Sequence, residues 1–309
     1  MGQQSTRRYF SLQLVPMLLI RGINKAIKES SMSSERKSIL CPNCRKLISS
    51  DEPSCPYCGI LRPGLHNTAG VIRNIFLGSD PVRTIVYVNI AYYILSLLLD
   101  PSGILSGGGM FNFLAPSSQS LFLLGATGTI PVIQFHRIWT LISASFLHGG
   151  ILHIAFNMMA LYQLGPFILR EFGFYRFINL YIITGVAGFA ASVLFGVPFT
   201  IGASASICGL IGAILYYGKS RSGYYGQAIF KQAMGWVVGL VVFGLIIGGI
   251  NNWAHGGGIL SGILLGFLMG YNETKPETAW IKLLAYVCIL ITVIILVWSV
   301  AYSLISVIS

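Results

Sequence analysis

The stretch WIKLLAYVCILITVIILVWSVAYSLIS, residues 280–306, decides the class of the protein, because it is apolar for longer than a bilayer is thick. A helix that crosses a hydrocarbon core of about 30 Å requires about 20 mostly apolar residues. Six further runs reach or approach this length. The seven runs lie at about 83–100, 145–165, 174–196, 203–218, 233–250, 254–271 and 280–306. The sequence therefore predicts an all-α polytopic membrane protein.

The fourth and sixth runs are short and rich in glycine and alanine. Small residues allow the backbones of neighbouring membrane helices to approach closely. We therefore expect these two helices to be buried within the bundle.

Composition supports a membrane location. Of the 309 residues, 54% are hydrophobic and only 9% are charged, whereas about a quarter of the residues of a soluble domain are charged. The formal net charge of +11 comes mainly from residues that precede the first apolar run or lie in short connections. This distribution is typical of a topology signal and not of a binding groove. The lipid bilayer is the expected partner, and no nucleic acid is expected.

The basic residues also predict the orientation, because cytoplasmic loops of membrane proteins carry an excess of Lys and Arg. If the N-terminus is cytoplasmic, 19 of the 20 basic residues lie inside and only Arg137 lies outside. The C-terminus then lies on the outer side. We expect a multi-pass protein of the plasma membrane or the bacterial inner membrane. The long outer connection, 101–138, is expected to lie partly in the lipid interface, with an ordinary loop as the alternative.

A few polar side chains fall inside the apolar runs, where they are costly and indicate function. The second, fourth and sixth runs cross the membrane in the same direction, and the polar residues fall in their outer halves. The topology therefore places all of them at one depth, near the outer face. They are His148, His153 and Asn157 in the second run, Ser204 at the start of the fourth, and His255 at the start of the sixth.

Serine and histidine suggest nucleophilic catalysis, since a hydroxyl requires a base to act as a nucleophile at neutral pH. Between residues 101 and 270 the only carboxylate is Glu171, which the charge distribution places in a cytoplasmic loop. The expected site is therefore a Ser204–His255 dyad without an acid. The backbone N–H of Ser204 and the side chains of His153 and Asn157 are the candidate oxyanion donors.

Other interpretations of the same residues remain open. A single serine in a membrane helix usually packs or bonds a carbonyl of its own helix, and a single histidine can relay protons or join helices. A transporter would place such groups near the bilayer midplane between inverted repeats. The sequence shows no inverted repeat, and its polar residues lie near one face.

Three motifs resemble the rhomboid family of intramembrane proteases. They are RIWTLISASFLHGGILHIAFN (137–157), GASA (202–205), and AHGGG (254–258) followed by Gly262. The resemblance covers roughly residues 85–270. It implies a rhomboid-like six-helix core, to which this chain adds a C-terminal seventh transmembrane helix.

The resemblance also implies roles for individual residues. Ser204 matches the nucleophile, His255 the general base, and His153 with Asn157 the oxyanion-supporting pair. Residues with structural roles near the site are His148, Gly202, Gly258 and Gly262. Gly258 and Gly262 match the tight packing between the fourth and sixth spans.

The family's activity implies a substrate class. The expected substrates are single-span membrane proteins, cut near the outer membrane face without a catalytic cofactor. The alternative is a catalytically silent rhomboid-like scaffold that binds membrane proteins. Two positions depart from the family pattern: Ala205 stands where glycine is frequent, and Cys208 where an aromatic residue commonly packs on the catalytic histidine.

A separate motif precedes the membrane region. Cys41, Cys44, Cys55 and Cys58 form a C-x2-C-x10-C-x2-C pattern, which can supply four thiolates to zinc. The metal would be structural, because no coordination position is left open. A redox dithiol or a disulfide pair is the alternative, which a cytoplasmic location disfavours.

These patterns divide the chain into five segments. We expect a basic N-terminal segment (1–38), a zinc-ribbon-like module (39–62), a linker (63–82), the rhomboid-like membrane core (83–271) and the C-terminal seventh helix (272–309).

Overall fold

A computed structural model describes residues 38–41, 46–57, 59, 80–103 and 113–308. The chain divides into two compact units, Met1–Gly78 and Ser79–Ser309. Nearly all regular structure in the described residues is helical, as the sequence predicts.

The first unit contains a small antiparallel hairpin. Strand β1 (Ser38–Leu40) pairs with β2 (Leu47–Ser49), and Ile39 lies opposite Ile48. Cys41 and Cys55 are buried against Ile48, with exposed fractions of 1% and 2%. Cys44 and Cys58 lie outside the described residues, as do most of the predicted basic segment and linker. The hairpin therefore places two of the four predicted zinc ligands beside one small apolar cluster.

The second unit consists of long helices and a few short helical turns. In chain order the elements are α3 (Pro81–Leu99), α5 (Ser118–Leu123), the π-helical turn η3 (Ile130–Gln134), α6 (Thr140–Ser143), the 3₁₀ turn η4 (Ala144–Phe146), α7 (Ile151–Phe172), α8 (Phe174–Leu194), α9 (Ser204–Ser220), α10 (Gly223–Ile246), α11 (Asn252–Met269) and α12 (Ala279–Ile308).

Five helices in the described residues are long and apolar enough to cross a membrane: α3, α7, α8, α10 and α12. This confirms a multi-pass integral membrane protein. The two remaining predicted spans correspond to α9, with 17 residues, and α11, with 18. Neither α9 nor α11 is both long enough and apolar enough to be counted with the five spanning helices. These are the two helices that the sequence predicted to be short.

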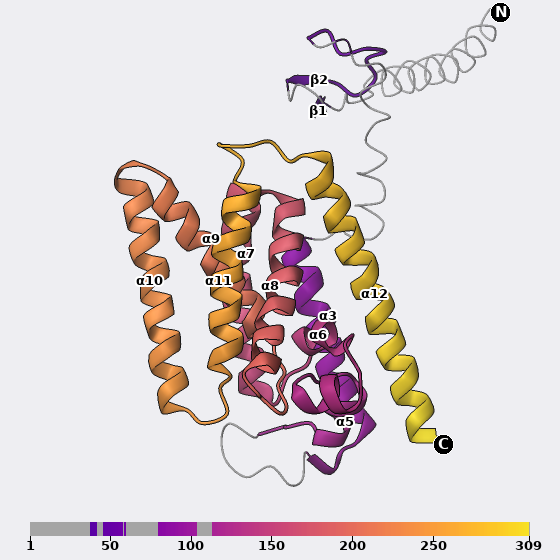
Figure 1. Cartoon of the computed structure of the whole chain (residues 1–309). Coiled ribbons are helices and arrows are strands. Elements are labelled where there is room, and N and C mark those ends of the chain that lie inside the picture. The colour runs from indigo at the N-terminus through magenta and orange to yellow at the C-terminus, as the bar shows by residue number, and fades with distance from the viewer. Residues whose placement is uncertain (1–37, 42–45, 58, 60–79, 104–112, 309) are drawn as a thin grey trace, which may run out of the picture. The chain divides into compact units, whose positions relative to one another are not determined.

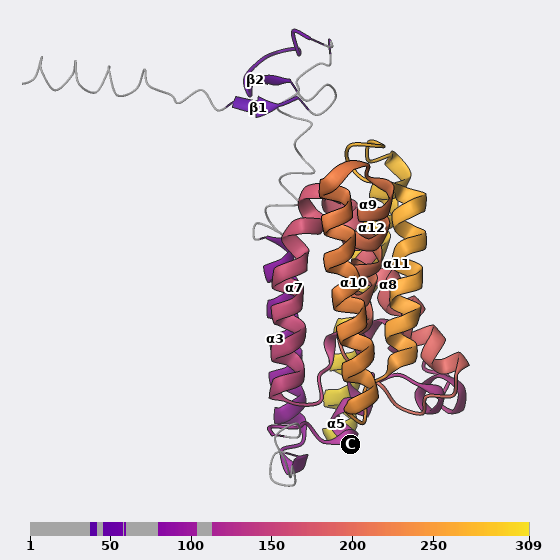
Figure 2. The same cartoon turned by 90° about the vertical axis from the view of Figure 1, so that its left-hand side faces the viewer.

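Helices α9 and α11 pack against each other without intervening side chains. A Cβ atom on Gly262 would lie 2.0 Å from the carbonyl oxygen of Gly209, and one on Gly258 would lie 2.3 Å from that of Ala205. Helix α9 is buried along almost its whole length. Helices α10 and α12 lie on opposite sides of the bundle (Figures 1 and 2). The short glycine-rich helices are therefore central, as expected.

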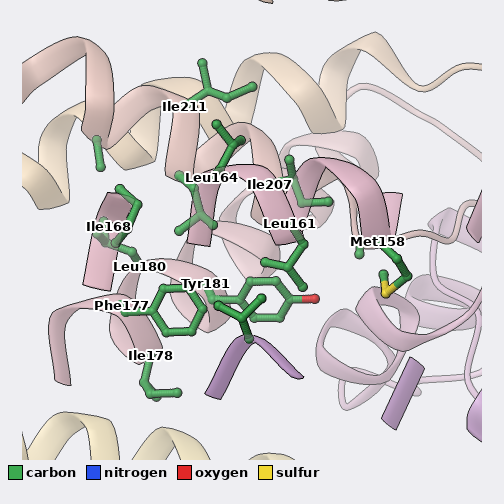
Figure 3. Packing of buried hydrophobic residues seen from close by; sticks show 14 of the residues in the cluster. Met158, Leu161, Leu164, Ile168, Phe177, Ile178, Leu180, Tyr181, Ile207 and Ile211 are labelled. Carbon is green, nitrogen blue, oxygen red and sulfur yellow. The ribbon is translucent and has the colours of Figure 1, made fainter. Parts of the chain in front are cut away.

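The apolar core joins α7, α8 and α9. Leu161, Leu164 and Ile168 of α7 face Phe177 and the other buried side chains of α8 in Figure 3. Ile207 and Ile211 complete the same cluster from α9. Burial of aliphatic and aromatic side chains at near-solid density fixes the relative positions of packed helices. This core fixes the relative positions of α7, which carries His153 and Asn157, and α9, which carries Ser204.

Two helix boundaries differ from the sequence prediction. The second span was predicted to begin at residue 145, but α7 begins at Ile151 because Gly149 and Gly150 precede it and residues 140–146 form α6 and η4. His148 therefore lies before the helix and not in the span. The fifth span, predicted at 233–250, is observed as α10 at Gly223–Ile246, and it ends before Gly248 and Gly249.

The connection between α3 and α6, predicted to be on the outer side, contains α5 and η3 in its described part and is held in place by Arg137. The guanidinium of Arg137 donates to the carbonyl oxygens of Phe122 (2.8 Å) and Leu123 (3.1 Å). It also lies over the rings of Trp139 and Tyr302, the latter from α12. Arg137 is only 8% exposed. Its role here is to hold the connection against the bundle, while the depth of this segment in the lipid stays a prediction.

Candidate active site

Ser204 is the first residue of α9, and its position is determined by backbone hydrogen bonds of the loop that precedes it. Thr200 N–H donates to the carbonyl oxygen of Thr127 (2.7 Å), and Thr127 N–H donates back to Thr200 (3.0 Å). Gly202 N–H donates to the carbonyl oxygen of Ala144 (2.9 Å). These bonds anchor the segment before α9 to the loop around Thr127 and to η4, so that Ser204 is presented from a fixed backbone.

Only glycine fits at position 202, because of the backbone conformation there and because a side chain would have no room. The φ of Gly202 is +124°, a region that side chains with a Cβ rarely adopt. A Cβ atom at this position would lie 2.7 Å from Nε2 of His153. The structure therefore places Gly202 directly against the predicted oxyanion-supporting histidine.

His255 lies in the first turn of α11 and reaches Ser204. The distance between His255 Nε2 and Ser204 Oγ is 3.0 Å, which is within hydrogen-bond range for a base and its nucleophile. Both side chains are partly buried. The structure thus brings together the two residues that the sequence predicts as a dyad, although they are separated by 51 positions in the chain.

Asn251 holds the start of α11 in place, a role that the sequence motifs did not predict. Its Oδ1 accepts from Ala254 N–H (3.1 Å), which caps the helix. Its Nδ2 donates to Ser192 Oγ (2.8 Å) and to Thr200 Oγ1 (2.9 Å). Asparagine is a preferred N-cap residue, so its position four residues before His255 was the available signal.

No carboxylate supports His255 in the described part of the chain. Its Nδ1 is buried and has no hydrogen-bond partner among the described residues. Glu171, the only carboxylate between positions 101 and 270, lies near the other end of α7, where it accepts from Tyr217 (2.9 Å) and pairs with Arg170 (2.7 Å). Within the described residues, the geometry corresponds to a dyad and not to a triad.

His153 is oriented by a backbone bond that also determines its tautomer. Gly149 N–H donates to His153 Nδ1 (3.3 Å). Because an N–H can only donate, Nδ1 is the acceptor, and the proton of the neutral ring is on Nε2. Nε2 is also the atom that a Cβ atom added to Gly202 would approach most closely. An N–H donor is thus available beside Ser204.

Asn157 lies one turn after His153 on the same helix. Its Nδ2 donates to the carbonyl oxygen of His153 (2.9 Å), and the side chain is 7% exposed. An amide nitrogen carries two protons, so a second N–H remains for another acceptor. Asn157 lines the same cavity as His153 and Ser204.

The remaining predicted residues surround the site. His148 is fully buried and packs its ring edge-on against His153, with the ring centroids 5.1 Å apart. Gly258 and Gly262 lie at the contact of α11 with α9. Cys208 is buried, lines the cavity and is in contact with the Gly258 position. Ala205 packs its carbonyl against Gly258.

A cavity of about 980 Å³ adjoins these residues. Its walls include Ser204, His255, His153 and Asn157, and it continues between α7 and α10, where Trp236 and Phe243 line it. Volumes of roughly 300–1,000 Å³ are typical of ligand sites. The space is therefore large enough for several residues of a polypeptide.

Residues 136–272 match the family model of the rhomboid domain. This segment contains α7, α8, α9, α10 and α11 and, among them, Ser204, His255, His153 and Asn157. The chain contains a rhomboid domain.

Several curated proteins are similar to this chain. RHOMBOID-like protein 4 of Arabidopsis thaliana is 30% identical over 218 residues, which cover 64% of this chain and 53% of that protein. RHOMBOID-like protein 6, mitochondrial, of the same organism is 34% identical over 177 residues, covering 54% of each chain. Rhomboid protease GluP of Bacillus subtilis is 30% identical over 196 residues, covering 63% of this chain and 36% of GluP. The chain spans about half or less of the length of these relatives.

The predicted zinc ligands are only partly within the described residues. Cys41 N–H donates to the carbonyl oxygen of Lys46 (2.9 Å), and Gly59 N–H donates to that of Cys55 (2.9 Å). Gly59 has a φ of +74°. Among the described residues no group of three or more metal-binding side chains occurs, and two of the four predicted cysteines lie outside them.

Proposed function

We propose that this chain is an intramembrane serine endopeptidase that hydrolyses a peptide bond in or near the transmembrane segment of single-span membrane proteins. The 3.0 Å contact between Ser204 Oγ and His255 Nε2 carries the proposal. The rhomboid domain and the likeness to Rhomboid protease GluP support it.

The proposed reaction begins with proton transfer from Ser204 Oγ to His255 Nε2. Oγ forms a bond to the scissile carbonyl carbon, and the carbonyl becomes a tetrahedral oxyanion. His255 then gives its proton to the leaving amine, and the C–N bond breaks. Water hydrolyses the resulting ester on Ser204 with His255 as base again. No cofactor takes part in these steps.

Three donors are available to stabilise the oxyanion. The backbone N–H of Ser204 lies in the first turn of α9, where N–H groups have no acceptor within their own helix and carry a partial positive charge. The Nε2–H of His153 and the second N–H of Asn157 come from α7, and both residues line the same cavity as Ser204. Removal of one such donor typically lowers kcat by about 10² to 10³-fold.

The site requires an extended substrate. The carbonyl of a residue inside an α-helix accepts a bond from its own helix and is shielded by the following turn. A transmembrane substrate must therefore unwind near the bond that is cut. The position of the dyad at the start of α9 and α11, toward one end of the bundle, favours cleavage near one membrane face, which the distribution of basic residues predicts to be the outer face.

A cleavage assay tests the proposal. Purified full-length protein in detergent should cleave a single-span substrate, and Ser204→Ala or His255→Ala should abolish cleavage. Ser206→Ala is the matched control, because Ser206 lies on the same helix but points toward Gly185, away from the cavity. This variant should retain cleavage. Equal cleavage by Ser204→Ala and the parent protein would refute the mechanism.

The silent scaffold is the alternative, and the same assay separates the two. A scaffold would bind single-span proteins without forming products, and Ser204→Ala would bind as the parent does. The assembled dyad and the donors beside it favour the protease.

We also propose that Cys41, Cys44, Cys55 and Cys58 hold a structural zinc ion. The burial of Cys41 and Cys55 at the β1–β2 hairpin supports this, because a unit with so small a core gains folding energy from a metal. Metal analysis should find about one equivalent of zinc in the parent and none in the Cys41→Ser, Cys44→Ser double variant. Cys288→Ser in α12 is the control and should keep the metal. An unchanged zinc content in the double variant would exclude this site.

A further inference from the structure

Gln163 is an amide in the middle of a membrane-spanning helix. It is the thirteenth of the 22 residues of α7, and between Asn157 and Arg170 it is the only amide or charged side chain. The side chain is exposed, and it has no hydrogen-bond partner among the described residues. Polar groups at this depth are costly unless they bond to something.

Gln163 lines the same cavity as the catalytic pair. The α7 wall of this cavity runs from His153 through Asn157 and Ala160 to Gln163, at the spacing of one helix face. Opposite, α10 contributes Gly235 and Gly239, and a Cβ atom added to either glycine would meet no atom within 4 Å. The cavity is therefore open at the depth of Gln163.

We propose that Gln163 determines substrate specificity by hydrogen bonding to a polar side chain within the transmembrane segment of the substrate. This inference rests on the proposed function. Gln163 is a positioning residue here and takes no part in the chemical steps. The amide offers both a donor and an acceptor, so serine, threonine, asparagine and glutamine all fit. A purely apolar substrate segment would leave the amide unbonded.

The helix geometry predicts which substrate position is recognised. Gln163 lies six residues beyond Asn157, which corresponds to about 9 Å along α7. An extended chain covers this distance in about three residues and a helix in about six. The preferred polar residue should therefore lie about three to six positions from the scissile bond, on the side that enters the membrane.

A paired substrate series tests this inference. In single-span substrates, threonine and the nearly isosteric valine are exchanged at each position of that window, and kcat/KM is measured for the parent, Gln163→Leu and Tyr162→Phe. A hydrogen bond between membrane helices corresponds to a preference of about threefold to tenfold. The parent should show this preference at one position, and Gln163→Leu should lose it. Tyr162 is exposed beside Gln163 but does not line the cavity, so Tyr162→Phe should keep it.

A binding measurement tests the role of Gln163 without requiring catalysis. The same threonine and valine segments are titrated onto Ser204→Ala protein and onto the Ser204→Ala, Gln163→Leu double variant, with fluorescence transfer as the readout. Tighter binding of the threonine segment that depends on Gln163 supports the inference even if no substrate is cut. No preference at any position in the parent, or a preference that survives in Gln163→Leu, overturns it. Failure of the proposed function appears separately, as cleavage that does not depend on Ser204.

Discussion

Asn251 Nδ2 donates to Thr200 Oγ1 over 2.9 Å, and this bond joins the start of α11 to the loop that leads into α9. The two helices carry His255 and Ser204, so the contact links the proposed base and the proposed nucleophile through their supporting backbones. The same amide group bonds Ser192 of α8. Three segments that are distant in the chain thus meet at one side chain.

We expect Asn251→Ala to reduce cleavage through the position of His255. The substitution removes an N-cap, which costs about 1 kcal/mol of stability, and two bonds to neighbouring segments. Misplacement of a catalytic group by about 1 Å can lower a rate 10²-fold, so kcat should fall about 10-fold to 100-fold with a smaller change in KM. Asn252→Ala is the control, because Asn252 donates to the carbonyl oxygen of Gly244 and not to the loop before α9. A similar loss of kcat in both variants would contradict the assigned role.

Gly202→Ala should inactivate the protein more than it destabilises it. The added Cβ would lie 2.7 Å from His153 Nε2 and would displace a proposed oxyanion donor. Gly196→Ala provides the comparison, because Gly196 also has a positive φ, +78°, but its Cβ would meet no atom within 4 Å. Both variants carry backbone strain of about 1–3 kcal/mol. Thermal unfolding should therefore shift similarly, while cleavage should fall strongly only in Gly202→Ala. Normal cleavage by Gly202→Ala would show that His153 does not act at this position.

Gly262→Ala should separate α9 from α11. Its Cβ would lie 2.0 Å from the carbonyl oxygen of Gly209, and backbone atoms cannot yield as a flexible side chain does. Overpacking of this kind typically costs about 1–3 kcal/mol, and the Ser204–His255 contact should lengthen with it. Gly256→Ala on the same helix meets no atom within 4 Å and should leave thermal stability unchanged or slightly higher. The result to measure is the unfolding midpoint of both variants in the same detergent.

The sequence was sufficient to predict the helical membrane fold and to identify Ser204 and His255, which the structure brings into contact, for a physical reason. Polar groups are rare in membrane helices, so Ser204, His153 and His255 were conspicuous, and the distribution of basic residues predicted a common depth for them. The short helices α9 and α11 were also recognisable, because close backbone contact requires glycine.

Features made by irregular backbone were not predictable in the same way. The sequence placed His148 inside a span, although Gly149 and Gly150 end the preceding turns and α7 begins only at Ile151. Asn251 was overlooked because its partners, Thr200 and Ser192, are ordinary polar residues with no fixed spacing from it. Such contacts depend on how loops fold back onto the bundle, which hydropathy does not encode.

The orientation in the membrane can be tested with two single cysteines. Gln119 in α5 is exposed near the predicted outer end, and Tyr224 at the start of α10 is 88% exposed near the predicted inner end. With the N-terminus in the cytoplasm, a membrane-impermeant maleimide should label Gln119→Cys in intact cells and Tyr224→Cys only after the membrane is opened. The parent protein reports the background from its own six cysteines. The reverse labelling pattern would place the Ser204–His255 pair toward the cytoplasmic face, so that substrates would have to be cut from the inside.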